Sequence, residues 1–165
     1  MKKTLMLCLV MALFPLCLAA QQKIAIVNSD EIMAAMPETK AAQARLQELD
    51  KRYSEELQKM QEQYAQKTEA FISESEKLDA TIRKSRQQEL VDLQSRIQQS
   101  ANVMQEDFQK QQTTLYTPIQ QKIFDAIKAV SDKEGITYVV NSMMMLYKGK
   151  DAIDITPLVK KHLGL

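Results

Sequence analysis

Few side chains in this sequence are suited to catalysis. The only histidine, His162, could act as a general base or a metal ligand, but it stands alone near the C-terminus. Acidic neighbours such as Glu55 and Glu56 could do acid–base chemistry, yet they lie among alternating charges, which is typical of a solvated helix face. All three glycines lie at or beyond Gly135, so no glycine-rich loop can hold the phosphates of a nucleotide. We therefore expect a protein that is not an enzyme and that has no cofactor and no metal.

The first twenty residues have the layout of a secretory signal peptide. A basic start at Lys2 and Lys3 precedes an apolar run from Leu5 to Leu18, and two alanines follow. The apolar run is shorter than the roughly 20 residues that a membrane-spanning helix needs. We expect residues 1–20 to be removed on export.

Loss of the signal peptide changes what the mature chain can do. Both cysteines, Cys8 and Cys17, leave with it, so no disulfide, thiolate metal site or cysteine nucleophile remains. A lipid anchor at Cys17 is the weaker alternative, because bulky residues precede this cysteine. Removing Lys2 and Lys3 changes the net charge from +1 to −1, which disfavours bulk binding of nucleic acid.

The middle of the chain has the composition of long helices: it lacks glycine and is rich in Gln, Glu, Lys, Ala and Leu. From Glu38 to Leu78, apolar residues recur at helical spacing and form one stripe on an otherwise polar surface. Such a stripe needs a partner helix to shield it from water. Its members are Leu46, Leu49, Tyr53, Leu57, Met60, Tyr64 and Phe71.

A second amphipathic helix is predicted from Ser85 to Lys133, with Ser85 and Gln88 spaced as a capping box. The two helices have similar lengths, so a turn near residues 79–85 would fold them into an antiparallel hairpin, the arm of residues 38–133. Because this turn has no glycine, a single kinked helix is the alternative. The matching stripe consists of Leu90, Leu93, Ile97, Met104, Phe108 and Leu115.

The two ends of the chain carry strand patterns. Apolar, β-branched runs at residues 23–28 and 136–141 predict two strands. Because the hairpin between them folds back on itself, we expect the two strands to lie side by side. Met143–Lys148 is expected to form a third strand, and Thr156 is expected to cap a short last helix. This body, residues 21–37 and 134–165, is too small to be stable alone, so we expect it to oligomerise. The residues expected to mediate this are Ile24, Ile26, Val27, Ile136, Tyr138, Val139 and Val140.

The predicted fold class is α+β and predominantly helical, with a long antiparallel coiled-coil hairpin on a small β body. The sequence resembles the Skp/OmpH family of periplasmic chaperones in its opening Lys23–Asn28, its strand Ile136–Asn141 and its ending Asp154–Lys160. The resemblance covers essentially the whole mature chain. It implies a homotrimer in the periplasm of a Gram-negative bacterium, whose arms enclose unfolded outer-membrane proteins without using ATP.

Family members are often strongly basic, whereas this mature chain is near neutral. The case for contact with the membrane surface or with lipopolysaccharide is therefore weaker here.

A structural or adaptor coiled-coil protein of the bacterial envelope is the alternative function, because long helical hairpins also serve as spacers. Such a rod would need a continuous apolar seam. Lys67, Thr68 and Gln112 interrupt the seam with polar side chains, which favours the chaperone.

Three local features each have two interpretations. Pro118, inside the second helix, predicts either a simple bend or a hinge that lets the arms open. The cations Arg83, Lys84 and Arg86 near the tip either belong to a solvated turn or contact the client or an anionic lipid. The methionines at positions 143–145 are either core residues of a strand or client contacts.

Overall fold

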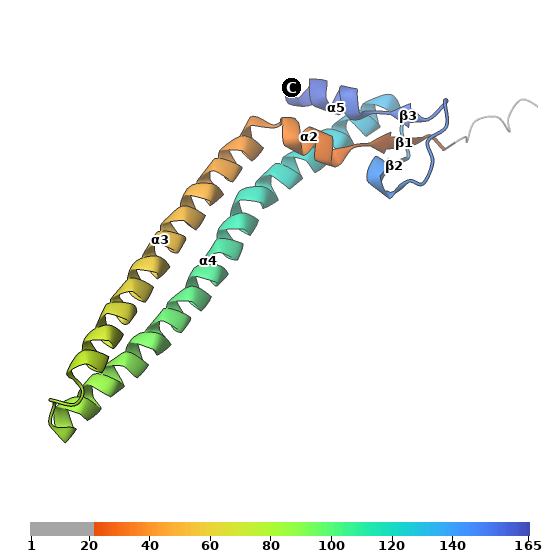
Figure 1. Cartoon of the computed structure of the whole chain (residues 1–165). Helices are drawn as coiled ribbons and strands as arrows, with labels where there is room; N and C mark the ends of the chain where they lie inside the picture. Colours follow the sequence, from red (N-terminus) through yellow and green to blue (C-terminus); the bar gives the residue numbers. More distant parts are fainter. Residues whose placement is uncertain (1–21) are drawn as a thin grey trace, which may run out of the picture. The chain divides into compact units, whose positions relative to one another are not determined.

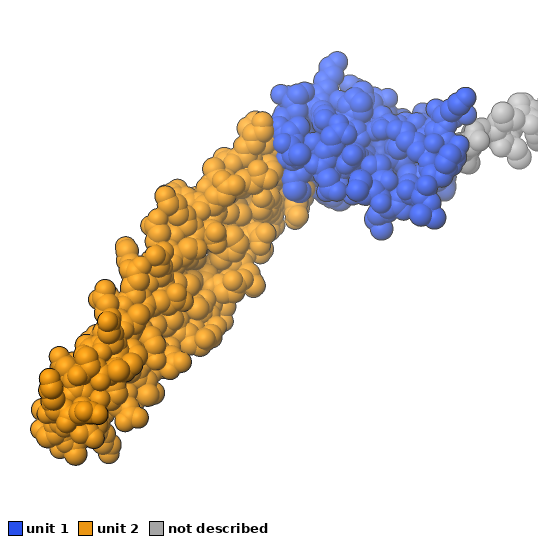
Figure 2. All heavy atoms as spheres, in the orientation of Figure 1, with its two compact units in different colours: residues 1–35, 122–165 blue, residues 36–121 orange. Residues whose placement is uncertain are grey.

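The computed structural model describes residues 22–165, and the predicted signal peptide lies outside this range. The described chain forms two compact units (Figure 2). The body consists of the described residues up to Ala35 together with Lys122–Leu165, and the arm consists of Met36–Gln121. One long helix contributes to both units, so residues 122–134 group with the body.

A three-stranded parallel sheet organises the body (Figure 1). Strand β1 (Ile24–Val27) lies between β2 (Tyr138–Asn141) and β3 (Ile153–Asp154), and both neighbours run parallel to it. The predictions of strands at residues 23–28 and 136–141 are confirmed. Parallel neighbours need a long connection between them, and the helical hairpin is the connection from β1 to β2.

The prediction of a third strand at residues 143–148 is wrong. The chain instead makes a 3₁₀ turn, η2 (Ser142–Met144), and the third strand follows only later. The side-chain oxygen of Asn141 accepts a hydrogen bond from the backbone N–H of Met143 at 3.0 Å. This local bond offers the backbone an alternative to a sheet ladder, which explains why the apolar run does not continue as a strand.

Helix α2 (Ser29–Ala35) follows β1 and begins at a side-chain cap. The Asn28 side chain accepts a hydrogen bond from the backbone N–H of Glu31 at 3.1 Å, and its amide nitrogen lies 3.4 Å from the Glu31 carboxylate. The two residues therefore form the reciprocal cap that their spacing indicates.

Helix α5 (Thr156–Leu163) is capped differently from the prediction. Thr156 is its first residue, and the Thr156 hydroxyl accepts a hydrogen bond from the backbone N–H of Asn28 at 2.9 Å. The backbone N–H of Thr156 is bound by the Asp154 carboxylate at 3.0 Å. Asp154 takes the role that we expected of Thr156, because the Thr156 hydroxyl is engaged with the backbone of Asn28 and Thr156 already lies inside the helix.

Two helices end at glycines, α4 before Gly135 and α5 before Gly164. Their φ angles are +64° and +76°, in the left-handed region that residues with a Cβ rarely adopt. Gly135 turns the chain out of the long helix just before β2.

The core of the body is built from β1, α2, α5 and the last turns of the long helix. These elements meet through apolar side chains that are almost fully removed from water. The core residues are Ala25, Ile26, Val27, Ile32, Ile123, Ala126, Val130, Ile155 and Val159.

An ion pair between Lys148 and Asp154 connects the two ends of the loop that precedes α5. Lys148 Nζ lies 2.7 Å from the Asp154 carboxylate, and this lysine, together with Thr156, lowers the pKa of Asp154 from 3.8 to about 2. The folded body therefore favours the charged carboxylate. The resulting stabilisation is complete above pH 3.8 and is lost as the pH falls toward 2.

We expect Lys148→Met to destabilise the body near neutral pH, and we expect the difference from the unchanged chain to vanish near pH 2. Thermal unfolding measured at several pH values between 2 and 7 tests this. Lys150→Met, which removes a neighbouring lysine, is the matched control and should show no such pH dependence. A Lys148→Met deficit as large at pH 2 as at pH 7 would contradict the assignment.

The arm is the predicted antiparallel hairpin. Helix α3 (Pro37–Glu74) pairs with the part of α4 (Ala80–Glu134) that ends at Gln121 (Figure 1). Pro37 is the first residue of α3, where its missing N–H costs no hydrogen bond. Because residues 75–79 are not helical, the alternative of a single kinked helix is excluded.

The tip of the hairpin lies earlier than predicted. Helix α4 begins at Ala80, so residues 80–85 belong to the helix and not to the turn. The cap is Asp79, whose carboxylate accepts hydrogen bonds from the backbone N–H groups of Thr81 at 2.8 Å and Ile82 at 3.0 Å. An aspartate is as good a cap as Ser85, and it stands first along the chain.

Candidate functional site

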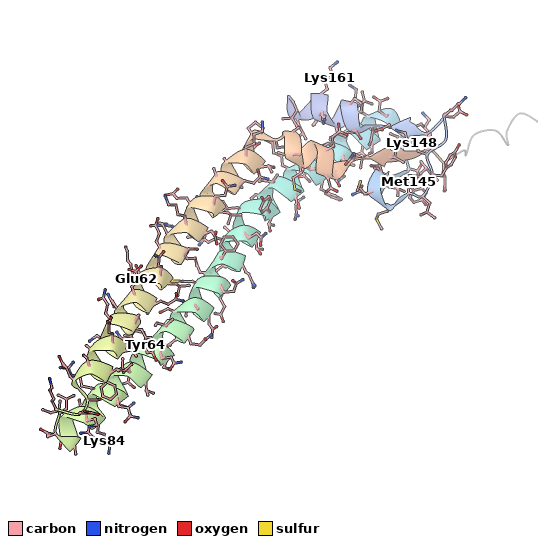
Figure 3. The ribbon with its side chains drawn as sticks, in the orientation of Figure 1. Glu62, Tyr64, Lys84, Met145, Lys148 and Lys161 are labelled. Atoms are coloured by element: carbon pink, nitrogen blue, oxygen red, sulfur yellow. The ribbon has the colours of Figure 1, made fainter. Side chains whose placement is uncertain are left out.

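The predicted seam residues of the arm are shielded to different degrees. Leu46 and Leu49 on α3 and Leu93 on α4 are buried. The remaining ten are only half-buried, and Figure 3 labels Tyr64 among them. The arm therefore keeps partly accessible apolar surface along most of its length. The half-buried seam residues are Tyr53, Leu57, Met60, Tyr64, Phe71, Leu90, Ile97, Met104, Phe108 and Leu115.

Two polar bridges connect the helices of the arm. The Tyr53 hydroxyl donates a hydrogen bond to the Asp107 carboxylate at 2.5 Å, and this contact raises the pKa of the phenol. Lys67 forms an ion pair with Glu89 and lowers the pKa of that carboxyl. Polar contacts of this kind tie one helix to the other at defined positions, so they favour a single register.

Asp107 is a seam residue that the sequence pattern missed. The pattern counts only apolar side chains, and Asp107 stands beside Phe108 in the stripe of α4. Its signal is its distance from the tip: Tyr53 and Asp107 lie similar numbers of residues before and after the turn, so an antiparallel hairpin brings them together.

A shallow groove of about 340 Å³ lies beside the Tyr53–Asp107 bridge. Its lining mixes apolar side chains with both signs of charge, which does not define a small ligand in the way that a few convergent polar groups do. The lining suits weak contacts with a polypeptide. It consists of Arg45, Leu46, Glu48, Leu49, Arg52, Tyr53, Asp107, Gln111 and Leu115.

The predicted cations of the tip lie in the first turns of α4. The Arg83 guanidinium donates a hydrogen bond to the carbonyl of Leu78 at 3.1 Å, so this side chain secures the turn. Lys84, labelled in Figure 3, and Arg86 are exposed. These two remain the candidates for a contact with a client.

One face of the body sheet carries exposed apolar side chains. Because strand partners share a face, Ile24 lies on the same side as Tyr138, and Ile26 on the same side as Val140. Ile24 and Tyr138 are 57% and 53% exposed, and Val140 is also exposed. We call Ile24, Tyr138 and Val140 the open face.

The other predicted oligomerisation residues lie deeper. Ile26 and Val27 are buried within the subunit, while Ile136 and Val139 are half-buried. Of the predicted oligomerisation residues, only those of the open face are therefore placed for contact with another subunit.

The described residues 22–165 contain no group of three or more His, Cys, Asp or Glu side chains arranged for a metal ion. His162 is exposed on α5. Within the same range, every helix is too short or too polar to cross a lipid bilayer.

The fold and the seam together define a class: a small β body with a long, polar-surfaced helical hairpin between its first two strands. The family described as "Outer membrane protein (OmpH-like)" matches residues 23–163. The chain belongs to this family.

Individual relatives agree with this assignment. A protein named chaperone protein Skp from Pectobacterium atrosepticum is 29% identical over 143 residues, which cover 87% of this chain and 86% of that protein. The chaperone protein Skp of Photorhabdus laumondii is 28% identical over 128 residues, 78% of each chain. Both relatives are named as chaperones.

A solved structure shows the same fold. The crystal structure of an OmpH-like protein from Caulobacter crescentus superposes with a TM-score of 0.75 and covers 87% of this chain and 85% of that one. At 15% sequence identity, this match concerns the fold alone.

Proposed function

We propose that the chain is an ATP-independent holdase that keeps unfolded outer-membrane proteins from aggregating in the periplasm. The observation that carries the proposal is the family match over residues 23–163, with relatives named as chaperones over most of their length. The predicted signal peptide supports export to the periplasm.

The surface of the arm fits the holding of an unfolded chain. An unfolded β-barrel protein exposes apolar side chains and unpaired strand edges, through which it aggregates. The half-buried seam offers many small apolar contacts, and isolated exposed residues such as Ile72, Val91 and Val103 add others. Contacts of this kind are individually weak, so the client can leave when folding in the membrane becomes more favourable.

The proposed holdase works as a homo-oligomer, and we propose a trimer. The open face supports association, because Ile24, Tyr138 and Val140 expose apolar surface on a sheet too small to be stable alone. The sheet also has two edge strands, β2 and β3, whose outer sides are free to pair with another copy.

A structural rod is less well supported. A rod gains stiffness from a continuous buried seam, whereas most seam residues of this arm are half-buried and the Tyr53–Asp107 and Lys67–Glu89 bridges interrupt the apolar stripe.

Native mass spectrometry of the mature chain, with and without a urea-unfolded β-barrel protein, tests the proposal. We expect one oligomer mass alone and a second mass equal to one oligomer plus one client. An oligomer that binds no client would favour the rod.

Pro118 is proposed as a hinge that lets the arm adapt to clients of different size. It lies inside α4, close to Gln121, where the arm ends. A proline has no N–H to donate to the carbonyl of Thr114, four residues earlier, so this turn of the helix is weakened.

We expect Pro118→Ala to raise the free energy of unfolding by up to about 3 kcal/mol, because the interior hydrogen bond is restored. The stiffer arm should bind a narrower range of client sizes. Urea unfolding and binding of one small and one large β-barrel client measure the two effects, with the neighbouring Thr117→Ala as control. Unchanged capture of both clients would count against the hinge.

A further inference from the structure

The two helices of the arm differ in charge along the stretch where the Tyr53–Asp107 bridge places them opposite each other. Between Lys40 and Glu62, α3 has ten charged residues, whereas α4 has only three between Ile97 and Gln121. This stretch of α4 is rich in glutamine and asparagine instead. Five exposed amide side chains recur along it at alternating steps of four and three residues, and we call them the amide row. They are Gln98, Asn102, Gln105, Gln109 and Gln112.

The amide row lies on one flank of the α4 seam. Because an α-helix has 3.6 residues per turn, steps of four and three keep these side chains within a strip about 80° wide. The Gln98 amide accordingly donates a hydrogen bond to the Asn102 side chain at 3.3 Å. Glu89 and Asp107, which form the bridges to α3, lie on the other flank of the seam. The bridges therefore mark the side of the hairpin that is away from the amide row.

Helix α3 has a similar flank on the same side of the hairpin. Lys67 marks the flank of α3 that carries the bridges. Helical spacing places a group of exposed, uncharged side chains on the opposite flank, with Asp50 among them. Since both helices direct these residues away from the bridges, they share one broad face of the arm. The group on α3 is Gln43, Gln47, Ser54 and Gln61.

Two exposed apolar residues lie on this face as well. Ile72 follows Gln61 by three helical turns and is 69% exposed. Val91 precedes Gln98 by two turns and is 54% exposed. We call the amide row, the group on α3 and these two apolar residues the amide face.

The opposite face of the arm is charged. The groove beside the Tyr53–Asp107 bridge and a second groove beside the Lys67–Glu89 bridge lie there, and neither is lined by a residue of the amide face. The arm therefore has two broad faces of different chemistry. Charged lining residues are Arg45, Glu48 and Arg52 in the first groove and Asp92 and Arg96 in the second.

We propose that the amide face is the surface of the arm that holds the client, and that it binds the neutral backbone of an unfolded polypeptide. This inference rests on the proposed holdase and names the surface that does the holding. A carboxamide both donates and accepts hydrogen bonds, so it pairs with either the N–H or the C=O of an extended chain. Every polypeptide has these groups, so the amide face does not select its client by sequence.

The lack of charge on the amide face fits the same occupant. A neutral surface neither attracts nor repels the charged side chains of a client, and salt has little effect on hydrogen bonds between neutral groups. Ile72 and Val91 add contacts for apolar side chains of the client. The charged face of the arm remains in water and keeps the loaded protein soluble.

Photo-crosslinking locates the held client on one face or the other. A photoreactive amino acid replaces Gln105 on the amide face or, as the matched control, Gln63 on the charged face; both are exposed glutamines of the arm. The full mature protein is then mixed with a urea-unfolded β-barrel protein. We expect several-fold more crosslinking to the client from position 105 than from position 63.

A matched pair of double substitutions measures what the amides contribute. Gln105→Ala with Gln109→Ala should weaken client binding about tenfold at any salt concentration, because two hydrogen bonds are lost while alanine preserves the helix. Gln63→Ala with Gln66→Ala removes two exposed glutamines outside the amide face and should leave the affinity unchanged.

Equal crosslinking from positions 105 and 63, or equal affinities of the two double variants, would overturn the inference and leave the holdase intact. Crosslinks from position 105 to a second copy of the chain in place of the client would also overturn it, because the face would then be a contact between subunits. An unchanged protein that holds no client would instead overturn the proposed function, and the inference with it.

Discussion

A chain that carries Tyr138→Glu and Val140→Glu should stay folded, separate into single subunits and lose most of its capacity to hold an unfolded client. Both side chains lie on the open face, where Tyr138 is 53% and Val140 is 37% exposed, so most of what they lose on substitution is surface rather than core. In an oligomer they would place unpaired carboxylates inside an interface, and each buried charge costs several kcal/mol. Sedimentation or native mass spectrometry measures the loss of association, which we expect to exceed about a thousandfold.

Val103→Glu is the matched control for this double substitution. Val103 is an exposed apolar residue of the arm, and a glutamate there should leave the oligomer mass unchanged. Circular dichroism of both variants checks that the fold is retained. An oligomer that survives glutamates at both Tyr138 and Val140 would show that the open face is not the contact between subunits.

A substitution in the arm is also expected to change stability strongly. Leu46→Ala should lower the free energy of unfolding by about 2–4 kcal/mol, because it removes a buried leucine from the best-packed part of the seam and leaves a cavity. Urea unfolding followed by helical circular dichroism measures the change.

Ile72→Ala is the comparison for Leu46→Ala. Ile72 lies on the same helix but is largely exposed, so its loss should change the free energy of unfolding by less than about 0.5 kcal/mol. Equal effects at the two positions would contradict the pairing of α3 with α4 through the predicted seam.

The hairpin and the first two strands could be predicted from the sequence, because each depends on a repeating pattern. The stripe from Leu46 to Phe71 requires a partner helix, and the similar lengths predicted for the two helices bring residues 23–28 beside residues 136–141. The structure pairs Ala25 with Val139, as this geometry demands.

The errors all fall where a side-chain hydrogen bond overrides the pattern read from the sequence. Asp79 caps α4 ahead of Ser85, and Asn141 turns the chain before a third strand can form. The Thr156 hydroxyl accepts a hydrogen bond from the backbone of Asn28, and the Asp154 carboxylate binds the first N–H of α5. In each case one side chain decides the outcome. The spacing of apolar residues along the sequence carries no information about such hydrogen bonds.

The candidate surfaces were harder to predict than the fold. Apolar composition alone does not distinguish a core strand from an exposed segment, so the sequence leaves the methionines at 143–145 with both interpretations, core strand residues or client contacts. Strand register is needed to see that Tyr138 and Val140 face outward while Val139 faces inward. Register depends on contacts between distant segments, which one sequence does not supply.

The holding of unfolded clients is the central claim, and light scattering tests it most directly. A urea-unfolded outer-membrane β-barrel protein is diluted into buffer with increasing amounts of the mature chain and no nucleotide. The account predicts that scattering is abolished near one oligomer per client. Scattering that stays at the level of the client alone, even with excess mature chain present, would contradict it.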